Sequence, residues 1–424
     1  MQKVLVITYY WPPSGGAGVQ RWVKLSKYLP QFGIQPVILT VDPNKASYPV
    51  YDHSLEKEID EALEVHRTDS FEPLRIYGKM VGSKNVPTAG FSNVDKKKWS
   101  TKIAARIRST LFIPDPRKGW NSFALAKAKE LIREQGISKV ITTGPPHSTH
   151  LIGMALKEEM NVQWTADMRD PWTDIYYYKD LHHTARSAAK DKALELKVLM
   201  QADRIICANA HLKELLADKS KNLDSEKFFV LTNGFDPEDI QRPVPERKDD
   251  LFWITYTGTI SDHYEPEVFL ESFAAISGRN DRLRIRFVGT VSGSIVKSAE
   301  TLGIRDKLEL IDTVPHKESI DYLLRSDALL LVIPKVDHDK SIVPGKLFEY
   351  IGARKPIVCI GPPDGASAEI IDDCAAGKTF QRSSNEQLTL YLEQIVENGP
   401  TPMNGPRVGS FSRKEQAKVL ASAL

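Results

Sequence analysis

The sequence has few cysteines, almost no net charge and no long apolar run, and each of these shortages excludes a class of protein. Only 3 cysteines occur among 424 residues, and they are widely spaced. Neither a disulfide framework nor a paired-cysteine metal site is therefore expected, and a reducing compartment is the simple inference. A formal net charge of +2 excludes a globally basic nucleic-acid-binding protein. The apolar run after Lys3 meets Pro12 and Pro13 too soon for a signal sequence or a membrane span, so we expect a cytoplasmic protein.

The remaining composition is that of a globular protein, with 41% hydrophobic and 26% charged residues. A chain of 424 residues is too long for one compact core and predicts two domains of about 200 residues each. Apolar runs alternate with amphipathic segments such as 124–134, which is typical of parallel sheets wrapped by helices. The predicted strands begin near Val4, Pro36, Val140, Val162, Arg204 and Phe229, and then span 252–257, 283–288, 307–311, 328–333 and 356–360.

A segment rich in proline and charge, residues 236–250, is the predicted domain linker. Residues 1–235 then form an N-terminal Rossmann-like domain, and residues 251–405 form a second one. Residues 406–424 are expected to end in a helix for which Ser412 is the N-cap.

An anion-binding strand-to-helix junction is predicted at residues 341–350. The apolar run 328–333 suits a strand buried on both faces, and Pro344 can open the helix that follows. Free amides near Gly345, the helix dipole and the charge of Lys346 suit a diphosphate. Glu349 lies one turn further along, where a carboxylate can accept hydrogen bonds from a ribose diol. The alternative is a surface helix with an ordinary lysine and glutamate.

Three further blocks give the chain a resemblance to a known family. A Gly15-Gly16 loop follows the first strand, residues 165–172 contain Asp-x-Arg-Asp-Pro-Trp, and residues 232–236 contain Asn-Gly-x-Asp. Together with the junction at 341–350, these blocks resemble the GT-B glycosyltransferases of family 4 that build bacterial surface polysaccharides. The resemblance implies an α/β fold of two doubly wound parallel-sheet domains facing across a cleft. It also implies a retaining hexosyl transfer, a last helix that returns to the first domain, and no metal or other cofactor.

The resemblance implies roles for particular residues. The donor would be a UDP- or GDP-sugar, and the acceptor side would include Arg169 and Asp170. Those two residues could instead form a structural ion pair that holds their loop. The implied catalytic residues are Lys346, Asp170 and His147, and the implied donor-binding residues are Gly15, Gly16, Gly258, Thr259, Ser341, Pro344, Gly345, Lys346 and Glu349.

The sequence departs from the family pattern at three positions. Ser341 stands where many members have a glutamate, Thr259 where an arginine is expected, and Gly144 near where a histidine would fall. His147 or His150 could replace that histidine from the adjoining loop. The alternative reading of both is a capping or surface imidazole, more so for His150.

Two rival motifs point to other ligands. Gly16 and Gly18 lie between a strand and a helix, and Asp42 ends the next strand, as in a dinucleotide-binding fold. The third glycine of that motif is replaced by Arg21, whose bulk opposes close helix packing. Residues 337–339, Asp-His-Asp, match a metal-binding triplet by letter, but we interpret them as a solvated loop.

A basic insertion is predicted at residues 84–118, where nine Lys or Arg face two Asp, a local charge of +7. Ile103, Ile107 and Leu111 recur every four residues, which indicates a basic amphipathic helix. We expect it to dock on the inner leaflet of the cell membrane, where a polyprenyl-linked glycan would be presented. The alternative is a helix packed on its own domain.

These observations predict a glycosyltransferase that moves a sugar from a nucleotide diphosphate to a lipid-linked or surface polysaccharide such as capsule or lipopolysaccharide. The alternatives are a sugar-nucleotide 2-epimerase of the same fold and a non-catalytic binder of nucleotide sugars. The expected partners are the nucleotide sugar, the glycan acceptor and the membrane surface, with no nucleic acid.

Overall fold

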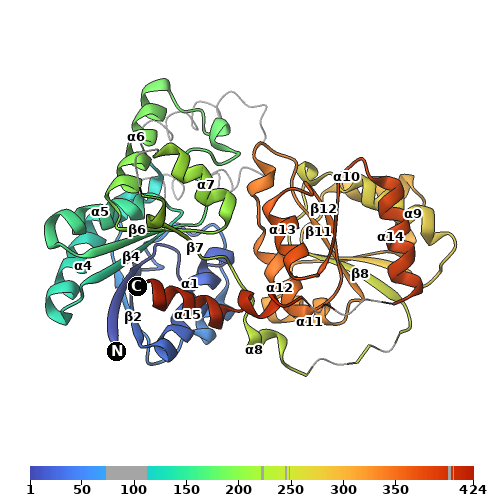
Figure 1. The fold of residues 1–424 in the computed structure, drawn as a ribbon, viewed down its shortest axis with the longest axis horizontal. Helices are drawn as coiled ribbons and strands as arrows, with labels where there is room; N and C mark the ends of the chain where they lie inside the picture. The colour runs from blue at the N-terminus through green and yellow to red at the C-terminus, as the bar shows by residue number, and fades with distance from the viewer. Residues whose placement is uncertain (73–111, 221–223, 244–245, 248, 400–402, 404) are drawn as a thin grey trace. The chain divides into compact units, whose positions relative to one another are not determined.

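The chain forms two compact units, each built on one parallel sheet (Figure 1). This computed structural model describes residues 1–424 except 73–111, 221–223, 244–245, 248, 400–402 and 404. The first unit comprises Met1–Thr232 with Gln416–Leu424, and the second comprises Asn233–Glu415. The predicted linker, 236–250, contains the short helix α8 (Pro237–Ile240), which Asp236 caps by accepting from the Glu238 amide at 3.0 Å.

The first unit contains a seven-stranded sheet in the order β3-β2-β1-β4-β5-β6-β7. Alternate residues of β1 pack on opposite faces, with Leu5 and Ile7 in one hydrophobic cluster and Val4 and Val6 in another. Both faces are therefore covered, which explains the continuous apolar runs. The strands are β1 (Gln2–Ile7), β2 (Ile34–Val41), β3 (Glu64–Thr68), β4 (Lys139–Gly144), β5 (Gln163–Met168), β6 (Arg204–Cys207) and β7 (Phe228–Val230). The helices are α1 (Ala17–Tyr28), α4 (Asn121–Gln135), α5 (Ser148–Met160), α6 (Ala185–Gln201) and α7 (Ala210–Lys219).

The second unit contains a six-stranded parallel sheet in the order β10-β9-β8-β11-β12-β13. In β11, Leu329 and Leu331 pack in one cluster while Leu330 and Val332 pack in another. The strands are β8 (Phe252–Thr257), β9 (Leu283–Val288), β10 (Leu308–Ile311), β11 (Ala328–Val332), β12 (Ile357–Ile360) and β13 (Gly377–Phe380). The helices are α9 (Glu267–Ser277), α10 (Gly293–Thr301), α11 (His316–Leu324), α12 (Gly345–Ala353), α13 (Ala366–Asp373) and α14 (Asn385–Glu397). The predicted fold class, two Rossmann-like parallel-sheet domains, is confirmed.

The sequence analysis missed the strands β3 and β13. β3 carries Glu64, His66 and Arg67 in five residues, and β13 begins with Gly377 and Lys378. Both are edge strands, so neighbouring strands bury them less and their sequences lack the apolar runs of central strands.

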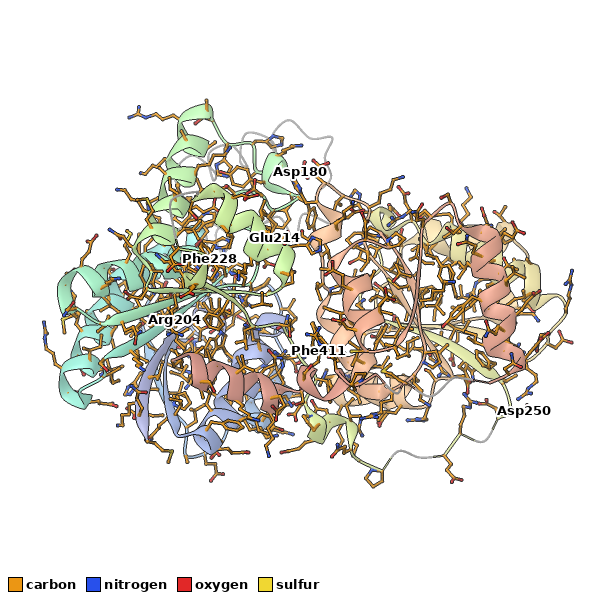
Figure 2. The ribbon with its side chains drawn as sticks, in the orientation of Figure 1. Asp180, Arg204, Glu214, Phe228, Asp250 and Phe411 are labelled. Carbon is orange, nitrogen blue, oxygen red and sulfur yellow. The ribbon has the colours of Figure 1, made fainter. Side chains whose placement is uncertain are left out.

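The last helix, α15 (Arg413–Ala423), begins after Ser412, whose hydroxyl accepts from the Glu415 amide at 3.3 Å. Ala417 and Leu420 are buried in the hydrophobic core of the first unit. Arg204, labelled in Figure 2, donates to the carbonyl oxygen of Ala423. The final turns of α15 are thus part of the first unit.

The Asn-Gly turn at residues 233–236 pairs with the segment before α15. The Phe235 amide donates to the carbonyl of Phe411 at 3.0 Å, and the Arg413 amide donates to the carbonyl of Phe235 at 2.7 Å. A Cβ atom at Gly234 would lie 2.4 Å from the Phe411 oxygen, so only glycine fits this close approach.

Two features bear on membrane association: helices that could span a bilayer, and the predicted basic helix. Within the described ranges, no helix is both long enough and apolar enough to span a bilayer. The basic helix predicted within 84–118 falls almost wholly on 73–111, which lie outside the described residues.

Candidate functional site

The strand order of the second unit reverses between β8 and β11, which are hydrogen-bonded neighbours. In such sheets, ligands bind outside the carboxyl ends of the strands at this switch point. The loop after β8 begins at Gly258, and the segment after β11 leads into α12. A Cβ atom at Gly258 would lie 3.0 Å from Nζ of Lys346, so the two loops meet where a ligand is expected.

Lys346 lies in the first turn of α12, and its ammonium group lies 3.9 Å from the centroid of the Tyr256 ring. A cation over an aromatic face is electrostatically favourable. Burial nevertheless lowers the pKa of Lys346 to about 7, while the charge of Glu349 partly opposes that shift. An anion bound beside this amine would favour its protonated form.

Glu349 lies one turn further along α12 and contacts a residue that the sequence analysis missed. Its Oε1 lies 3.0 Å from Nε2 of His316, the first residue of α11. The two side chains are only 21% and 15% exposed, respectively. His316 precedes Glu349 by 33 positions and belongs to no motif, so only its place beside α12 reveals it.

The remaining donor-side residues surround this junction. Pro344 is the extended N-cap of α12, so the amides of Gly345 and Lys346 begin a helix whose first turn lacks intrahelical acceptors. Gly258 and Thr259 are exposed at the end of β8, and the Thr259 carbonyl accepts from the Tyr256 hydroxyl at 2.8 Å. The Ser341 hydroxyl donates to the carbonyl of His338 at 2.8 Å.

A metal site was one possible reading of residues 337–339. The described part of the chain contains no group of three His, Cys, Asp or Glu side chains arranged to hold a metal ion. His338 instead adopts a left-handed conformation, with φ of 61°, at the start of a short 3-10 turn.

In the first unit, Arg169 follows β5 and is held by backbone carbonyls at the end of β4. Its Nε donates to the oxygen of Gly144 at 2.9 Å and its Nη2 to the oxygen of Pro145 at 2.6 Å. A Cβ atom at Gly18 would lie 1.3 Å from Nη1 of Arg169, so the guanidinium occupies the space that this glycine leaves. Arg169 therefore ties the glycine loop to the loop after β4.

The predicted donor glycines of the first unit shape the same loop. The Gly15 amide donates to the carbonyl of Val50 at 2.9 Å, and an added Cβ would lie 3.1 Å from Cβ of Asp52. Gly16 has a φ of 108° and begins α1 as its N-cap, a conformation that favours glycine. Contact of either residue with a donor stays a prediction.

His147 and His150 both approach Gly144. A Cβ atom at Gly144 would lie 2.5 Å from Nε2 of His150 and 3.1 Å from Nδ1 of His147. Neither of those nitrogens has a hydrogen-bond partner among the described residues. His147 stacks on Trp172 at 4.7 Å, and Nδ1 of His150 lies 2.9 Å from the hydroxyl oxygen of Thr142.

Burial keeps both imidazoles neutral. It lowers the pKa of His147 well below its usual range and that of His150 to about 3, with the charge of Arg169 contributing to both shifts. The interpretation of His150 as a surface or capping imidazole is wrong, because its side chain is fully buried. The sequence showed no apolar pattern that identifies this burial.

Asp170 is half-buried at the end of β5 and forms no hydrogen bond or ion pair with any described residue. Arg169 and Asp170 thus make no direct contact that is an ion pair, although the charge of each acts on the pKa of the other. Burial raises the pKa of the Asp170 carboxyl, and nearby Arg169 partly opposes this. Burial raises the pKa of Tyr176 and of Tyr177, and the Asp170 charge adds to both shifts. The two tyrosine rings meet edge to face at 5.1 Å.

Arg21, which replaces the third glycine of the dinucleotide motif, is a buried structural residue. Its Nη2 lies 3.1 Å from Oδ1 of Asp167, and both side chains are fully buried. Asp167 also accepts from Trp22 and Thr143, so its charge is fully partnered. Asp42 accepts from the Asn44 amide at 2.8 Å in a local turn. These contacts give the motif a role in folding.

Family comparison agrees with the geometry of the second unit. Residues 237–405 match the family Glycosyl transferases group 1. The match lies wholly within the second unit. The predicted enzyme class, glycosyltransferase, is confirmed at this level. A search of curated proteins finds no match.

Solved structures with this fold cover almost the whole chain. Anabaena Alr3699/HepE, in complex with UDP, has 11% identity and a TM-score of 0.58 over 100% of this chain and 95% of its own. The lipopolysaccharide outer core galactosyltransferase WaaB has 11% identity and a TM-score of 0.55 over 100% of both chains. A Listeria monocytogenes protein assigned as a UDP-N-acetylglucosamine 2-epimerase has 11% identity and a TM-score of 0.56 over 99% of this chain and 95% of its own. These likenesses show that the fold of this chain is GT-B.

Proposed function

We propose that the protein is a retaining glycosyltransferase that moves a sugar from a nucleotide diphosphate to a glycan acceptor. One observation carries the proposal: Lys346 and Gly258 meet at the switch point of the glycosyltransferase domain, with Glu349 one turn further along the same helix. A single ligand with a diphosphate and a ribose would occupy both positions.

On the donor side, the diphosphate accepts from the first amides of α12 and from Lys346, and the ribose diol donates to Glu349. A UDP complex is known for the Anabaena structure, which supports a uridine or related nucleotide here. Thr259 and Ser341 lack the charges usual at their positions, so the diphosphate depends more heavily on Lys346.

In the reaction, the bond from the anomeric carbon to the diphosphate oxygen breaks, and a bond from that carbon to the acceptor oxygen forms on the same face. The acceptor hydroxyl gives its proton to the departing diphosphate, so no carboxylate nucleophile is required. Lys346 stabilises the negative charge that develops on the diphosphate. Burial makes this stabilisation stronger than it would be in water.

On the acceptor side, we assign Asp170, Arg169 and His147 to the incoming glycan. The Asp170 carboxylate, which has no hydrogen-bond partner among the described residues, accepts from sugar hydroxyls. Tyr176, which is 48% exposed, supplies an apolar surface for the sugar. His147 is assigned here because its neutral ring stacks on Trp172, two residues after Asp170. The WaaB likeness supports a lipid-linked or surface polysaccharide as the acceptor class. We further propose a cytoplasmic protein that contacts the membrane peripherally.

The test has two parts. Calorimetric titration with UDP and with GDP measures donor binding, and Glu349→Ala is expected to weaken whichever nucleotide binds. Incubation of a UDP- or GDP-sugar with lipid-linked glycan extracts, followed by NMR of the product, is expected to show transfer with retained anomeric configuration. An unchanged affinity in the variant removes the ribose contact, and an inverted product removes the retaining mechanism.

A sugar-nucleotide 2-epimerase is the second candidate. The Listeria likeness and the two neutral buried histidines favour it, since an epimerase needs acid and base groups near the sugar. Incubation of the donor alone separates the two functions. An epimer in the NMR spectrum supports the epimerase, and an unchanged donor supports the transferase.

A further inference from the structure

Helix α6 (Ala185–Gln201) of the first unit has two chemically different faces. Ser187, Asp191, Glu195, Val198 and Leu199 are buried. The opposite face follows a spacing of four and three residues along the helix, as one side of an α-helix requires. Its exposed residues are Arg186, Ala189, Lys190, Lys192, Ala193, Leu196, Lys197 and Met200. We call these residues the outer face of α6.

Both acidic residues of α6 are directed inward and are fully partnered. Asp191 accepts from Nε1 of Trp172 and from the hydroxyl of Tyr178, each at 2.9 Å. Glu195 accepts from the Thr173 hydroxyl at 2.5 Å and pairs with Lys219 at 2.7 Å. The helix therefore buries its negative charge and presents only its positive charge to solvent.

The basic side chains of the outer face have no partner in the part of the chain that the structure describes. Arg186, Lys190, Lys192 and Lys197 form no hydrogen bond or ion pair with the described residues. Beside them, Leu196 is 39% exposed and Met200 is 57% exposed. At the end of the helix, Gln201 donates to Glu158 at 3.0 Å.

Helix α4 of the same unit does not share this pattern. Lys127 on α4 pairs with Glu130 of its own helix, and Lys129 pairs with Glu159 of α5. Their charges are thus balanced locally. The basic residues on the outer face of α6 repel one another, and no contact with the described residues offsets that repulsion. Figure 1 shows α6 at the edge of the first unit.

We propose that the outer face of α6 docks on an anionic phospholipid surface. Lysine and arginine attract anionic headgroups, while exposed leucine and methionine enter the boundary between headgroups and acyl chains. A nucleic acid would complement the charge but not the two apolar side chains. Long basic side chains also extend their charges to headgroup level while their stems lie on apolar surface.

Docking through α6 would act on the acceptor side of the proposed reaction. Trp172 and Tyr178, which flank the loop after Asp170, are both hydrogen-bonded to Asp191 on the inner face of the same helix. A membrane bound to the outer face would hold this loop at the surface that presents a lipid-linked glycan. That consequence rests on the proposed function, but the docking itself does not.

The test uses the full chain and sedimentation with vesicles. One set contains phosphatidylglycerol and phosphatidylcholine at 1:3, and the other contains phosphatidylcholine alone. Lys190→Gln with Lys197→Gln is expected to lower affinity for the anionic vesicles by about 25-fold, since each basic residue contributes roughly fivefold. Leu196→Ser with Met200→Ser is expected to lower the affinity for the anionic vesicles relative to the wild type. This loss should persist at high salt, where the charges are screened.

The matched control removes two exposed lysines of the second unit, Lys297→Gln with Lys317→Gln, and is expected to bind as the wild type does. The proposal is overturned if both α6 variants sediment as the wild type does, or if the wild type binds neutral and anionic vesicles equally. Release of the protein from the vesicles by RNA at equal phosphate concentration also overturns it. Calorimetry with UDP on the same variants checks the donor site, so failure of docking is distinguishable from failure of the proposed function.

Discussion

Nε2 of His316 lies 3.0 Å from Oε1 of Glu349, which joins the first residue of α11 to the middle of α12. The contact leaves the second carboxylate oxygen of Glu349 for a ligand. It also limits the rotamers of a side chain that would otherwise move freely at a half-buried site. His316 is therefore a positioning residue for the proposed ribose contact.

Removing these two side chains tests whether they act as a unit. Glu349→Ala is expected to weaken UDP binding at least tenfold, because charge-assisted bonds of about 1.5 to 3 kcal/mol are lost. His316→Ala is expected to have a smaller effect, because it only releases the carboxylate. The double variant is expected to bind like Glu349→Ala alone, as residues in direct contact are not additive. Calorimetry on all four proteins measures the coupling, and fully additive losses would contradict positioning.

Protonation of Lys346 should accompany donor binding. Because burial lowers its pKa to about 7, most of the free protein carries a neutral amine at pH 8. The bound diphosphate favours the ammonium form. UDP binding is therefore expected to take up close to one proton per molecule at pH 8 and almost none at pH 6. Affinity therefore falls as the pH rises above 7.

Calorimetry in buffers of different ionisation enthalpy measures this uptake. Lys346→Ala should abolish both the uptake and much of the affinity. Lys340→Ala is the control, since that exposed lysine pairs with Asp364 in a neighbouring loop. Equal proton uptake in the Lys346 variant would show that another group titrates.

A side chain at position 18 is expected to destabilise the fold, because Arg169 fills the space beside Gly18. Gly18→Ala places a methyl group on the guanidinium, so we expect a loss of roughly 1 to 3 kcal/mol in the free energy of unfolding and a loss of transfer activity. In an Arg169→Ala background the same change should cost little stability. Urea unfolding compares the two, and Gly293→Ala, where nothing lies within 4 Å, is the control.

Asp170→Asn tests the acceptor side without a change in size. The amide accepts more weakly than a carboxylate does, so we expect transfer to fall by roughly 10- to 100-fold, on the order of one lost charge-assisted hydrogen bond. UDP affinity should be unchanged, because Asp170 belongs to the first unit and Glu349 to the second. A loss of UDP affinity would assign Asp170 to the donor.

His150 should make the fold sensitive to acid. Its pKa is lowered from 6.5 to about 3, so between these values the unfolded chain holds a proton that the folded chain lacks. The stability from this group is present above pH 6.5 and declines as the pH falls, by up to about 1.4 kcal/mol per pH unit. His150→Gln should reduce that slope in urea unfolding between pH 7 and 5. His182→Asn, at an exposed site, should leave the slope as it is.

Much of the candidate anion site was predictable because it is local in sequence. A buried apolar run, a proline and a lysine and glutamate three positions apart lie within 328–349, so one strand-to-helix junction displays them together. The central strands were predictable for a similar reason, since burial on both faces demands continuous apolar residues. The edge strands β3 and β13 lack that demand and were missed.

The sequence by itself determined two parallel-sheet domains and a candidate anion site, because periodicity and helix geometry act over a few residues. Only the tertiary structure decided that His316 holds Glu349, that Arg169 fills the space over Gly18, and that His150 is buried and neutral. Each of these facts depends on which strands lie side by side. The strand order follows from packing both faces of a whole sheet at once, and no short segment of the chain carries that information.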